Sequence, residues 1–148
     1  MEETLVNQFD PQGVGLAAPQ VGVSLAFFII KLRPTSPTEV YINPKIVKES
    51  NKSASKKQGS SKDGEEKLEG CLSIPRIWGA LKRPQKVQIE YQGLDGKTHV
   101  NWVSGLKAVI VQHEIDHLKG VLFTQRSLEQ NVSLYEEDGN KLKRIKAL

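Results

Sequence analysis

Residues 104–119 constrain the fold most, because they predict one helix with apolar side chains on two of its faces. Ser104 is a suitable N-cap, and Gly120 is a suitable stop. One stripe at helical spacing holds Leu106, Val109, Ile110, His113 and His117. The second stripe holds Ala108, Val111, Ile115 and Leu118. The polar edge that remains is Lys107, Gln112, Asp116 and Lys119. Such a helix is expected at the centre of the molecule, with sheet packed on both flanks.

The same helix carries the motif H-E-x-x-H at residues 113–117. Residues i and i+4 lie on one helix face, so both imidazoles can reach a single metal ion. Glu114 is turned about 100° from His113 and can approach a catalytic water without binding the metal itself. Two incidental histidines on a buried helix are the alternative, but the motif is in register with an apolar stripe. The pattern predicts a metal-dependent hydrolase with His113 and His117 as ligands and Glu114 as acid/base.

Two histidines leave such a site one ligand short, because a catalytic metal usually has three protein ligands. A metzincin-type peptidase would have a third histidine where this chain has Phe123, and His99 lies beside a predicted hairpin turn. A thermolysin-type site would use a downstream glutamate, and Glu136 or Glu137 is available in a charged segment. Cys71, the only cysteine, lies in a compact apolar setting, and its thiolate suits zinc or ferrous iron. Cys71 is therefore the favoured third ligand.

The rest of the chain predicts an α+β fold, with mixed or antiparallel sheets packed around the central helix. Strands are predicted at residues 21–30, 40–47, 86–91 and 98–103, the last two forming a hairpin. Residues 48–67 are rich in Lys, Ser, Gly, Asp and Glu, which indicates a flexible polar loop. Residues 124–148 form a C-terminal tail, in which the Asp138-Gly139 turn favours a last strand or hairpin. We expect residues 1–148 to form a single domain.

Composition limits where the protein works and what it binds. The longest apolar run, residues 25–30, is too short to span a bilayer, and the N-terminus lacks a basic-then-apolar signal pattern. We therefore expect a cytoplasmic protein with no membrane partner. The formal net charge of +4 is mild, and no basic patch is interleaved with aromatic residues. Direct sequence-specific binding of nucleic acid is not expected.

Three segments, taken together, resemble the signature motifs of the peptide deformylase family. They are GVGLAAPQ at residues 13–20, EGCLS at residues 69–73 and HEIDHLKG at residues 113–120, in the family's order. The resemblance extends from about Gly13 to Phe123. It implies a deformylase-like catalytic domain whose N-terminal element is largely missing here. It also implies an enzyme that removes the formyl group from N-formylmethionine at the start of nascent proteins and releases formate.

The resemblance gives each matching residue a role. The implied metal ligands are Cys71, His113 and His117. The family's metal is typically ferrous iron, which zinc, nickel or cobalt can replace. Glu114 would be the catalytic acid/base, while Gln20 and the backbone N–H of Leu72 would stabilise the oxyanion.

The substrate needs an apolar slot for methionine and a backbone partner for the peptide. The candidates for the slot precede His113 on its stripe or lie in the glycine loop: Val14, Leu106, Val109 and Ile110. The backbone at Gly15 and Gly70 could pair with the peptide as an added strand, since glycine permits a close approach. The expected partners are N-formylmethionyl nascent peptides.

Two other functions stay open on the residues alone: an H-E-x-x-H metallopeptidase that cleaves internal amides, and an inactive or truncated metal-binding remnant. The basic tail (Lys141, Lys143, Arg144 and Lys146) could contact the ribosome, although such a charge run is more often a solvated surface. We expect a monomer.

Overall fold

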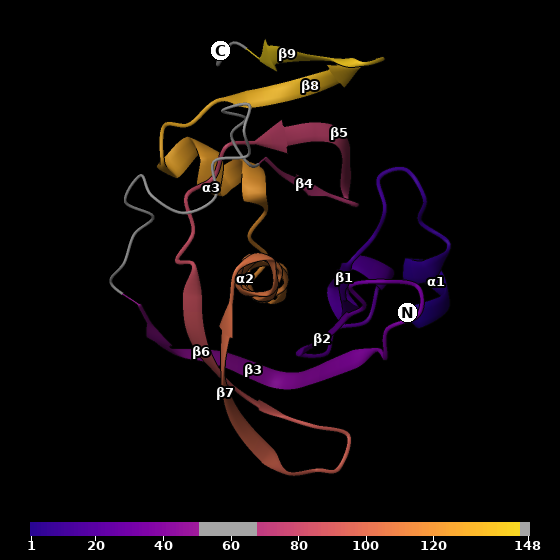
Figure 1. The fold of residues 1–148 in the computed structure, drawn as a ribbon, viewed down its shortest axis with the longest axis vertical. Coiled ribbons are helices and arrows are strands. Elements are labelled where there is room, and N and C mark those ends of the chain that lie inside the picture. The colour runs from indigo at the N-terminus through magenta and orange to yellow at the C-terminus, as the bar shows by residue number, and fades with distance from the viewer. Residues whose placement is uncertain (51–67, 146–148) are drawn as a thin grey trace.

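The computed structural model describes residues 1–50 and 68–145, and it places α2 (Leu106–Leu118) between two antiparallel sheets (Figure 1). The five-stranded sheet consists, in spatial order, of β1 (Gly15–Ala17), β2 (Phe27–Ile30), β3 (Glu39–Glu49), β6 (Lys86–Gln92) and β7 (Thr98–Ser104). The four-stranded sheet consists of β4 (Glu69–Cys71), β5 (Ile74–Gly79), β8 (Leu134–Asp138) and β9 (Lys141–Ile145). The other helices are α1 (Glu2–Val6), the 3-10 helix η1 (Ala18–Val21) and α3 (Phe123–Glu129). The predicted α+β class with a central helix is confirmed.

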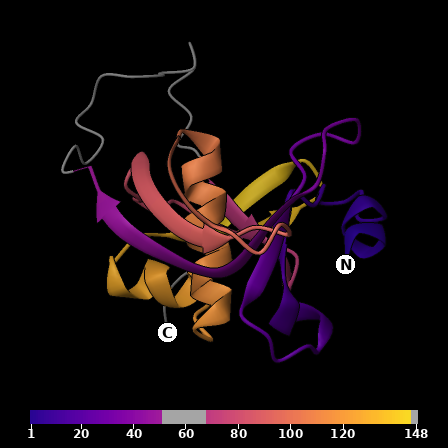
Figure 2. The same cartoon turned by 90° about the horizontal axis from the view of Figure 1, so that it is seen from below.

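The main core lies between the five-stranded sheet and α2. Figure 2 shows α2 side-on, running across the long curved strand β3. The sheet contributes Ala17, Phe28, Ile30, Tyr41, Val87, Ile89 and Val103 to this core. The helix contributes Ala108, Ile110, Val111 and Ile115. Burial of both helix stripes therefore fixes the direction in which the H-E-x-x-H motif points.

The two ends of α2 differ in how well the sequence predicted them. The N-cap is Gly105 rather than Ser104, and no side chain caps the helix; Ser104 instead ends β7, paired with Lys86. The stop at Gly120 is confirmed, with φ at 72°. The Gly120 N–H donates to the His117 carbonyl (3.0 Å), and the Val121 N–H donates to the Asp116 carbonyl (2.9 Å). This pair of bonds is a Schellman motif, which satisfies carbonyls that the helix end leaves free.

The predicted polar edge of α2 is wrong at two positions. Gln112 and Asp116 are each 6% exposed, because the chain at residues 83–84 and helix α3 lie over this side of the helix. The Gln112 side-chain amide donates to the Pro84 carbonyl at 2.9 Å. Leu106, assigned to an apolar stripe, is 67% exposed in the first turn.

The strand predictions hold for the hairpin and partly fail elsewhere. Residues 86–91 and 98–103 pair as β6 and β7, as predicted. Of the predicted strand at residues 21–30, only β2 is strand, because η1 and Gly22 (φ 79°) turn the chain first. β3 extends the strand predicted at residues 40–47, and Asn43 (φ 49°) lies at a shift in its pairing with β6. The short β4–β5 hairpin was not predicted.

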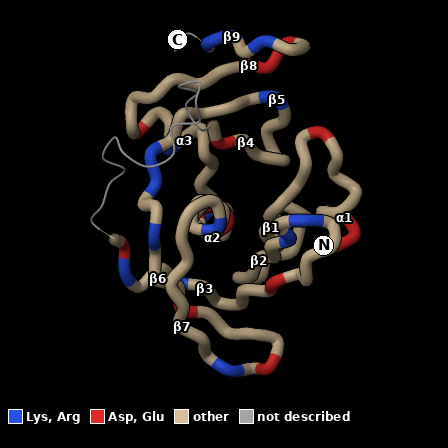
Figure 3. Tube along the Cα trace, in the orientation of Figure 1, with Lys and Arg blue, Asp and Glu red and all other residues tan. Residues whose placement is uncertain are grey.

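The C-terminal hairpin is confirmed as β8 and β9, which turn at Gly139 (φ 61°), whereas α3 was not predicted. Opposite charges face each other across the hairpin, since Glu136 pairs with Lys143. The charge-coloured tube shows acidic positions on β8 and basic positions on β9 (Figure 3). Of the predicted flexible loop, Lys48 and Glu49 continue β3, and residues 51–67 lie outside the described residues, as does Lys146. Among the described helices, none has the length and apolar character needed to cross a bilayer.

Replacing Gly120 with alanine should lower the free energy of unfolding by about 1 kcal/mol, because an L residue is strained at positive φ. No atom lies within 4 Å of the position a Cβ would take, so the backbone alone causes the loss. Urea unfolding measures it. Gly120→Asn should lose less, since asparagine tolerates this conformation better. An unchanged midpoint for Gly120→Ala would contradict the Schellman assignment.

Candidate metal centre

Three potential ligand atoms converge where the end of β4 meets one face of α2. They belong to Cys71, His113 and His117, and they all lie within 4.8 Å of one another. The Cys71 Sγ is 3.2 Å from the His117 Nε2, which is 3.0 Å from the His113 Nε2. All three side chains are buried. Within the part of the chain that the structure describes, this is the only such cluster of cysteine, histidine and acidic ligand atoms.

The charges at this cluster favour a cation. Burial alone would raise the pKa of the Cys71 thiol, but hydrogen bonds with His113 and His117 outweigh it and lower that pKa to about 6. Burial alone would lower the pKa of His113, but hydrogen bonds with Cys71 and Glu69 outweigh it and raise that pKa to about 10. The buried thiolate therefore favours a protonated imidazole at His113, and a divalent metal can take the place of that proton.

Glu114 supplies an independent sign that a group belongs here. Its carboxylate is buried beside the cluster, and the Oε2 atom has no hydrogen-bond partner. Burial raises the pKa of Glu114 to about 7, although the charges of His113 and His117 oppose the rise. An orphaned buried carboxylate oxygen is costly unless a metal site or a reacting molecule supplies its partner. One thiolate, two imidazoles and this carboxylate fit a catalytic transition-metal site.

The orientation of His113 is set by Glu69 of β4. The His113 Nδ1–H donates to the Glu69 Oε1 at 2.6 Å, which leaves Nε2 free to face the cluster. Two guanidinium nitrogens of Arg83 donate to the same carboxylate, each at 2.7 Å. These hydrogen bonds outweigh the opposing effect of burial and lower the pKa of Glu69. The charged acceptor behind His113 is therefore held in place.

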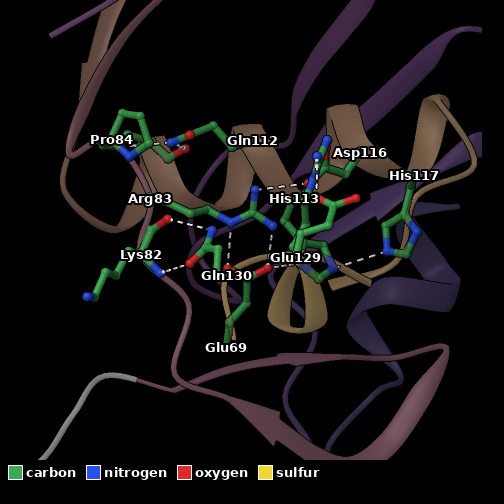
Figure 4. Close-up of polar contacts among 12 residues, drawn as sticks. Glu69, Lys82, Arg83, Pro84, Gln112, His113, Asp116, His117, Glu129 and Gln130 are labelled. Atoms are coloured by element: carbon green, nitrogen blue, oxygen red, sulfur yellow. Dashed lines mark hydrogen bonds and ion pairs between the residues drawn. The ribbon is translucent and has the colours of Figure 1, made fainter. Parts of the chain in front are cut away.

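Arg83 also links the ligand to α3 (Figure 4). Arg83 Nη1 donates to Asp116 Oδ2 at 3.0 Å, and Arg126 of α3 donates to Asp116 Oδ1 at 2.8 Å. The side chains of Glu69, Arg83 and Asp116 are each less than 10% exposed. No pattern in the sequence predicted a functional role for these three residues. The signal that could have located this network is Asp116, an acidic residue directly before the ligand candidate His117 on the same helix.

The two predicted oxyanion-stabilising residues lie beside the cluster. The Gln20 Oε1 accepts from the Ala17 N–H at 2.8 Å, and its Nε2 donates to the Ser73 Oγ at 3.0 Å. The same Nε2 is 3.9 Å from the Cys71 Sγ. Leu72 lies between Cys71 and Ser73. Its half-buried side chain packs against a small hydrophobic core formed by Leu5, Leu16 and Ile29. The Gln20 amide is thus held with its N–H side toward the cluster.

Gly15 and Gly70, whose backbone was predicted to pair with the substrate peptide, lie on strands at the edges of the two sheets. Gly15 is in β1, where an added Cβ would lie 2.3 Å from Glu114 Oε1. Gly70 is in β4, where an added Cβ would lie 2.7 Å from the ring of Trp78. Both strands lie on the side of their sheet that is near α2 in Figure 1.

The apolar pocket candidates are not all brought to the cluster. Ile110 is buried, and its side chain would lie 2.9 Å from a Cβ on Gly15. Val14 packs against the same core, and Val109 is half-buried. Leu106 lies about two turns before the first histidine and is exposed.

The other ligand candidates lie elsewhere. His99 bonds to Asp95 at the β6–β7 turn and stacks on Tyr91. Glu137 of β8 accepts from the Trp78 indole, and Glu136 is exposed on the same strand. Among the described residues, neither an additional histidine nor a downstream glutamate joins the cluster. This placement disfavours a thermolysin-type site.

Sequence comparison agrees with the geometry. The family model for polypeptide deformylases matches residues 1–132. The chain belongs to the peptide deformylase family. Peptide deformylases are metal-dependent enzymes that remove the N-formyl group from nascent peptides. The alternative function, a peptidase with an H-E-x-x-H motif that cleaves internal amides, is not favoured by this family membership.

Known relatives share both sequence and fold with this chain. A curated peptide deformylase from Novosphingobium aromaticivorans is 34% identical over 158 residues, which cover 90% of this chain and 78% of the relative. A deformylase structure from Thermotoga maritima has a TM-score of 0.68 and 34% identity, covering 84% of this chain and 76% of that one. A structure from Acinetobacter baumannii with Met-Ala-Ser bound has a TM-score of 0.69 and 34% identity, covering 85% and 76%. The match spans 66% of another relative, from Gloeobacter violaceus.

Replacing Glu69 with glutamine should weaken metal binding by about 10- to 100-fold, because the amide is a poorer acceptor for the His113 N–H. Competition with a chelator for Co²⁺ measures the affinity. Glu129→Gln is the matched control, since Glu129 lies at the exposed end of the same charge chain and should leave affinity unchanged. Equal affinities for the two variants would show that Glu69 does not orient the ligand.

Proposed function

We propose that this chain is an active deformylase whose Cys71, His113 and His117 hold one divalent metal ion. The observation that carries the proposal is the convergence of these ligands beside the buried, unpartnered Glu114 Oε2. Fe²⁺ is the first candidate because the family resemblance implies it, and one thiolate with two imidazoles suits such a borderline metal. Zn²⁺, Ni²⁺ and Co²⁺ suit the same donors.

The metal, when bound, would polarise the formyl carbonyl and make a water more acidic. Glu114 handles the proton: its Oε2 accepts a proton from the attacking water and passes it to the leaving amine. A pKa of about 7, raised mainly by burial, suits a group that must both take and give a proton near neutrality. The products are formate and a free methionine amine.

Gln20 and the Leu72 backbone N–H meet the negative charge that develops on the formyl oxygen. The Gln20 carbonyl is already fixed by the Ala17 N–H, so its amide nitrogen needs little reorientation. The Ser73 hydroxyl that now accepts from that nitrogen can yield its place to the oxyanion.

The peptide would add a strand between the edges of β1 and β4, with its backbone paired at Gly15 and Gly70. The Acinetobacter baumannii relative with Met-Ala-Ser bound supports a peptide ligand for this fold. Ile110 and Val14 are the buried candidates for the wall of the methionine slot, followed by half-buried Val109; exposed Leu106 could contribute only at an outer rim.

The setting follows from the substrate. We place this chain in the cytoplasm, where bacteria make N-formylmethionyl nascent peptides, and we expect it to act as a monomer. The basic residues of β9 could contact the ribosome, although Lys143 already pairs with Asp138. This pairing leaves less free charge for an acidic partner.

Metal-loaded protein should release formate from formyl-Met-Ala-Ser. The protein is loaded anaerobically with Fe²⁺, Ni²⁺ or Co²⁺, and formate is assayed. Glu114→Ala should abolish turnover but retain the metal, because Glu114 moves the proton without acting as a ligand. Folded, metal-loaded protein that releases no formate would instead be an inactive metal-binding remnant.

Gly15→Ala should reduce kcat by about 100-fold, since a small displacement of a catalytic group can cost that much. The new Cβ would overlap Glu114 Oε1 and push the carboxylate aside. Steady-state kinetics with formyl-Met-Ala-Ser measure the loss. Gly96→Ala, at a remote turn with φ 72°, controls for a general loss of stability. Full activity in Gly15→Ala would contradict the close approach of β1 to Glu114.

A further inference from the structure

The indole of Trp78 occupies the space that a side chain on Gly70 would fill. Three ring carbons lie 2.7–3.2 Å from the position of a Cβ built on Gly70. Trp78 is paired with Gly70 between β5 and β4, so the ring reaches from the second strand over the edge strand. The ring therefore extends toward the open edge of β4, where the proposed substrate would pair.

A hydrogen bond holds the ring in this position. The Trp78 Nε1–H donates to the Glu137 Oε2 of β8 at 2.9 Å. Tyr135 lies directly across from Trp78 on β8, on the same face of the sheet. Trp78 is only half-buried, so part of its surface can meet a ligand. An anchored aromatic ring loses little conformational freedom when it forms a contact.

The faces of β4 determine which part of a peptide the ring can touch. Glu69 and Cys71 point toward α2, where they contact His113 and His117. Successive side chains of a strand alternate, so the Gly70 position faces the opposite side, where the Trp78 ring lies. Residues directly paired on neighbouring strands point to the same face.

The same alternation applies to an added peptide strand. Its methionine must point toward α2 to enter a slot beside Ile110. The next residue then points away from α2, onto the face that carries Trp78. We propose that Trp78 is a specificity residue that contacts the side chain immediately after the methionine and favours large apolar side chains there. This inference rests on the proposed deformylase function and on strand pairing at Gly70.

A substrate pair isolates this contact. In the wild-type protein, kcat/KM should be about three- to tenfold higher for formyl-Met-Leu-Ser than for formyl-Met-Gly-Ser, the scale expected of one packed aromatic contact. In Trp78→Ala this ratio should fall close to one, through a higher KM for the leucine peptide with kcat retained. The glycine peptide has no side chain to lose, so its kcat/KM should change little.

Matched variants separate substrate contact from folding. Trp78→Phe keeps a ring and should keep most of the leucine preference. Glu137→Ala frees the indole and should lower the preference only partly. Trp102→Ala removes a 45% exposed tryptophan from β7 and should leave the ratio at the wild-type value. Co²⁺ binding confirms that each variant retains the metal centre.

Each outcome bears on one claim. A leucine preference that persists in Trp78→Ala, or the absence of any preference in the wild type, would overturn the specificity role. If Trp78→Ala does not fold, an unchanged ratio in Glu137→Ala would overturn it. Failure of the wild-type protein to deformylate both peptides would instead refute the proposed function on which the inference rests.

Discussion

The chain of buried charges behind His113 is the interaction on which the rest of the site depends. The charges alternate along it from the Glu69 carboxylate to Arg83 and Asp116 and then to Arg126, whose side chain is 34% exposed. Charges as deeply buried as the first three are tolerated only when each meets an opposite partner with good geometry, and removing one partner typically costs about 3–5 kcal/mol. This network joins β4, the segment before β6, α2 and α3, so the same contacts that orient His113 also hold the second sheet on the helix.

This arrangement explains why Glu114 differs from its charged neighbours. Arg83 satisfies Glu69 through two hydrogen bonds, and two arginines satisfy Asp116. Glu114 is just as buried but has an unpartnered oxygen, and the pKa of its carboxyl rises while the pKa values of Glu69 and Asp116 fall. The fold therefore fixes the charge of two carboxylates and leaves the third able to change its protonation state, as proton transfer requires.

The local parts of this site could be predicted from sequence, whereas the long-range parts could not. The helix, its stop at Gly120 and the common face of the two histidines follow from short-range periodicity. Arg83 and Glu69 are 14 residues apart, and Arg83 and Asp116 are 33 apart, so no local pattern pairs them. Helical spacing predicts an exposed Asp116, because it cannot reveal that α3 will cover that side. Leu106 shows the opposite error, because it was predicted to be buried and is exposed. An apolar stripe at helical spacing does not show how far along the helix other elements pack against it.

The two edge-strand glycines also have a different meaning in the structure than in the sequence. Glycine at such positions suggests room for a ligand's backbone, and the motifs alone support only that interpretation. Here each missing side chain also makes room for a protein side chain: Glu114 beside Gly15, and Trp78 beside Gly70. Glu114 lies beside Gly15 on the side of α2. Trp78 lies beside Gly70 on the face of β4 that points away from α2. A peptide strand between these edges would thus meet the Glu114 carboxylate on one face and the anchored Trp78 indole on the other. In the proposed binding mode, backbone pairing at these edges would hold a peptide whatever its sequence, and only the contacts on its two faces would distinguish its side chains.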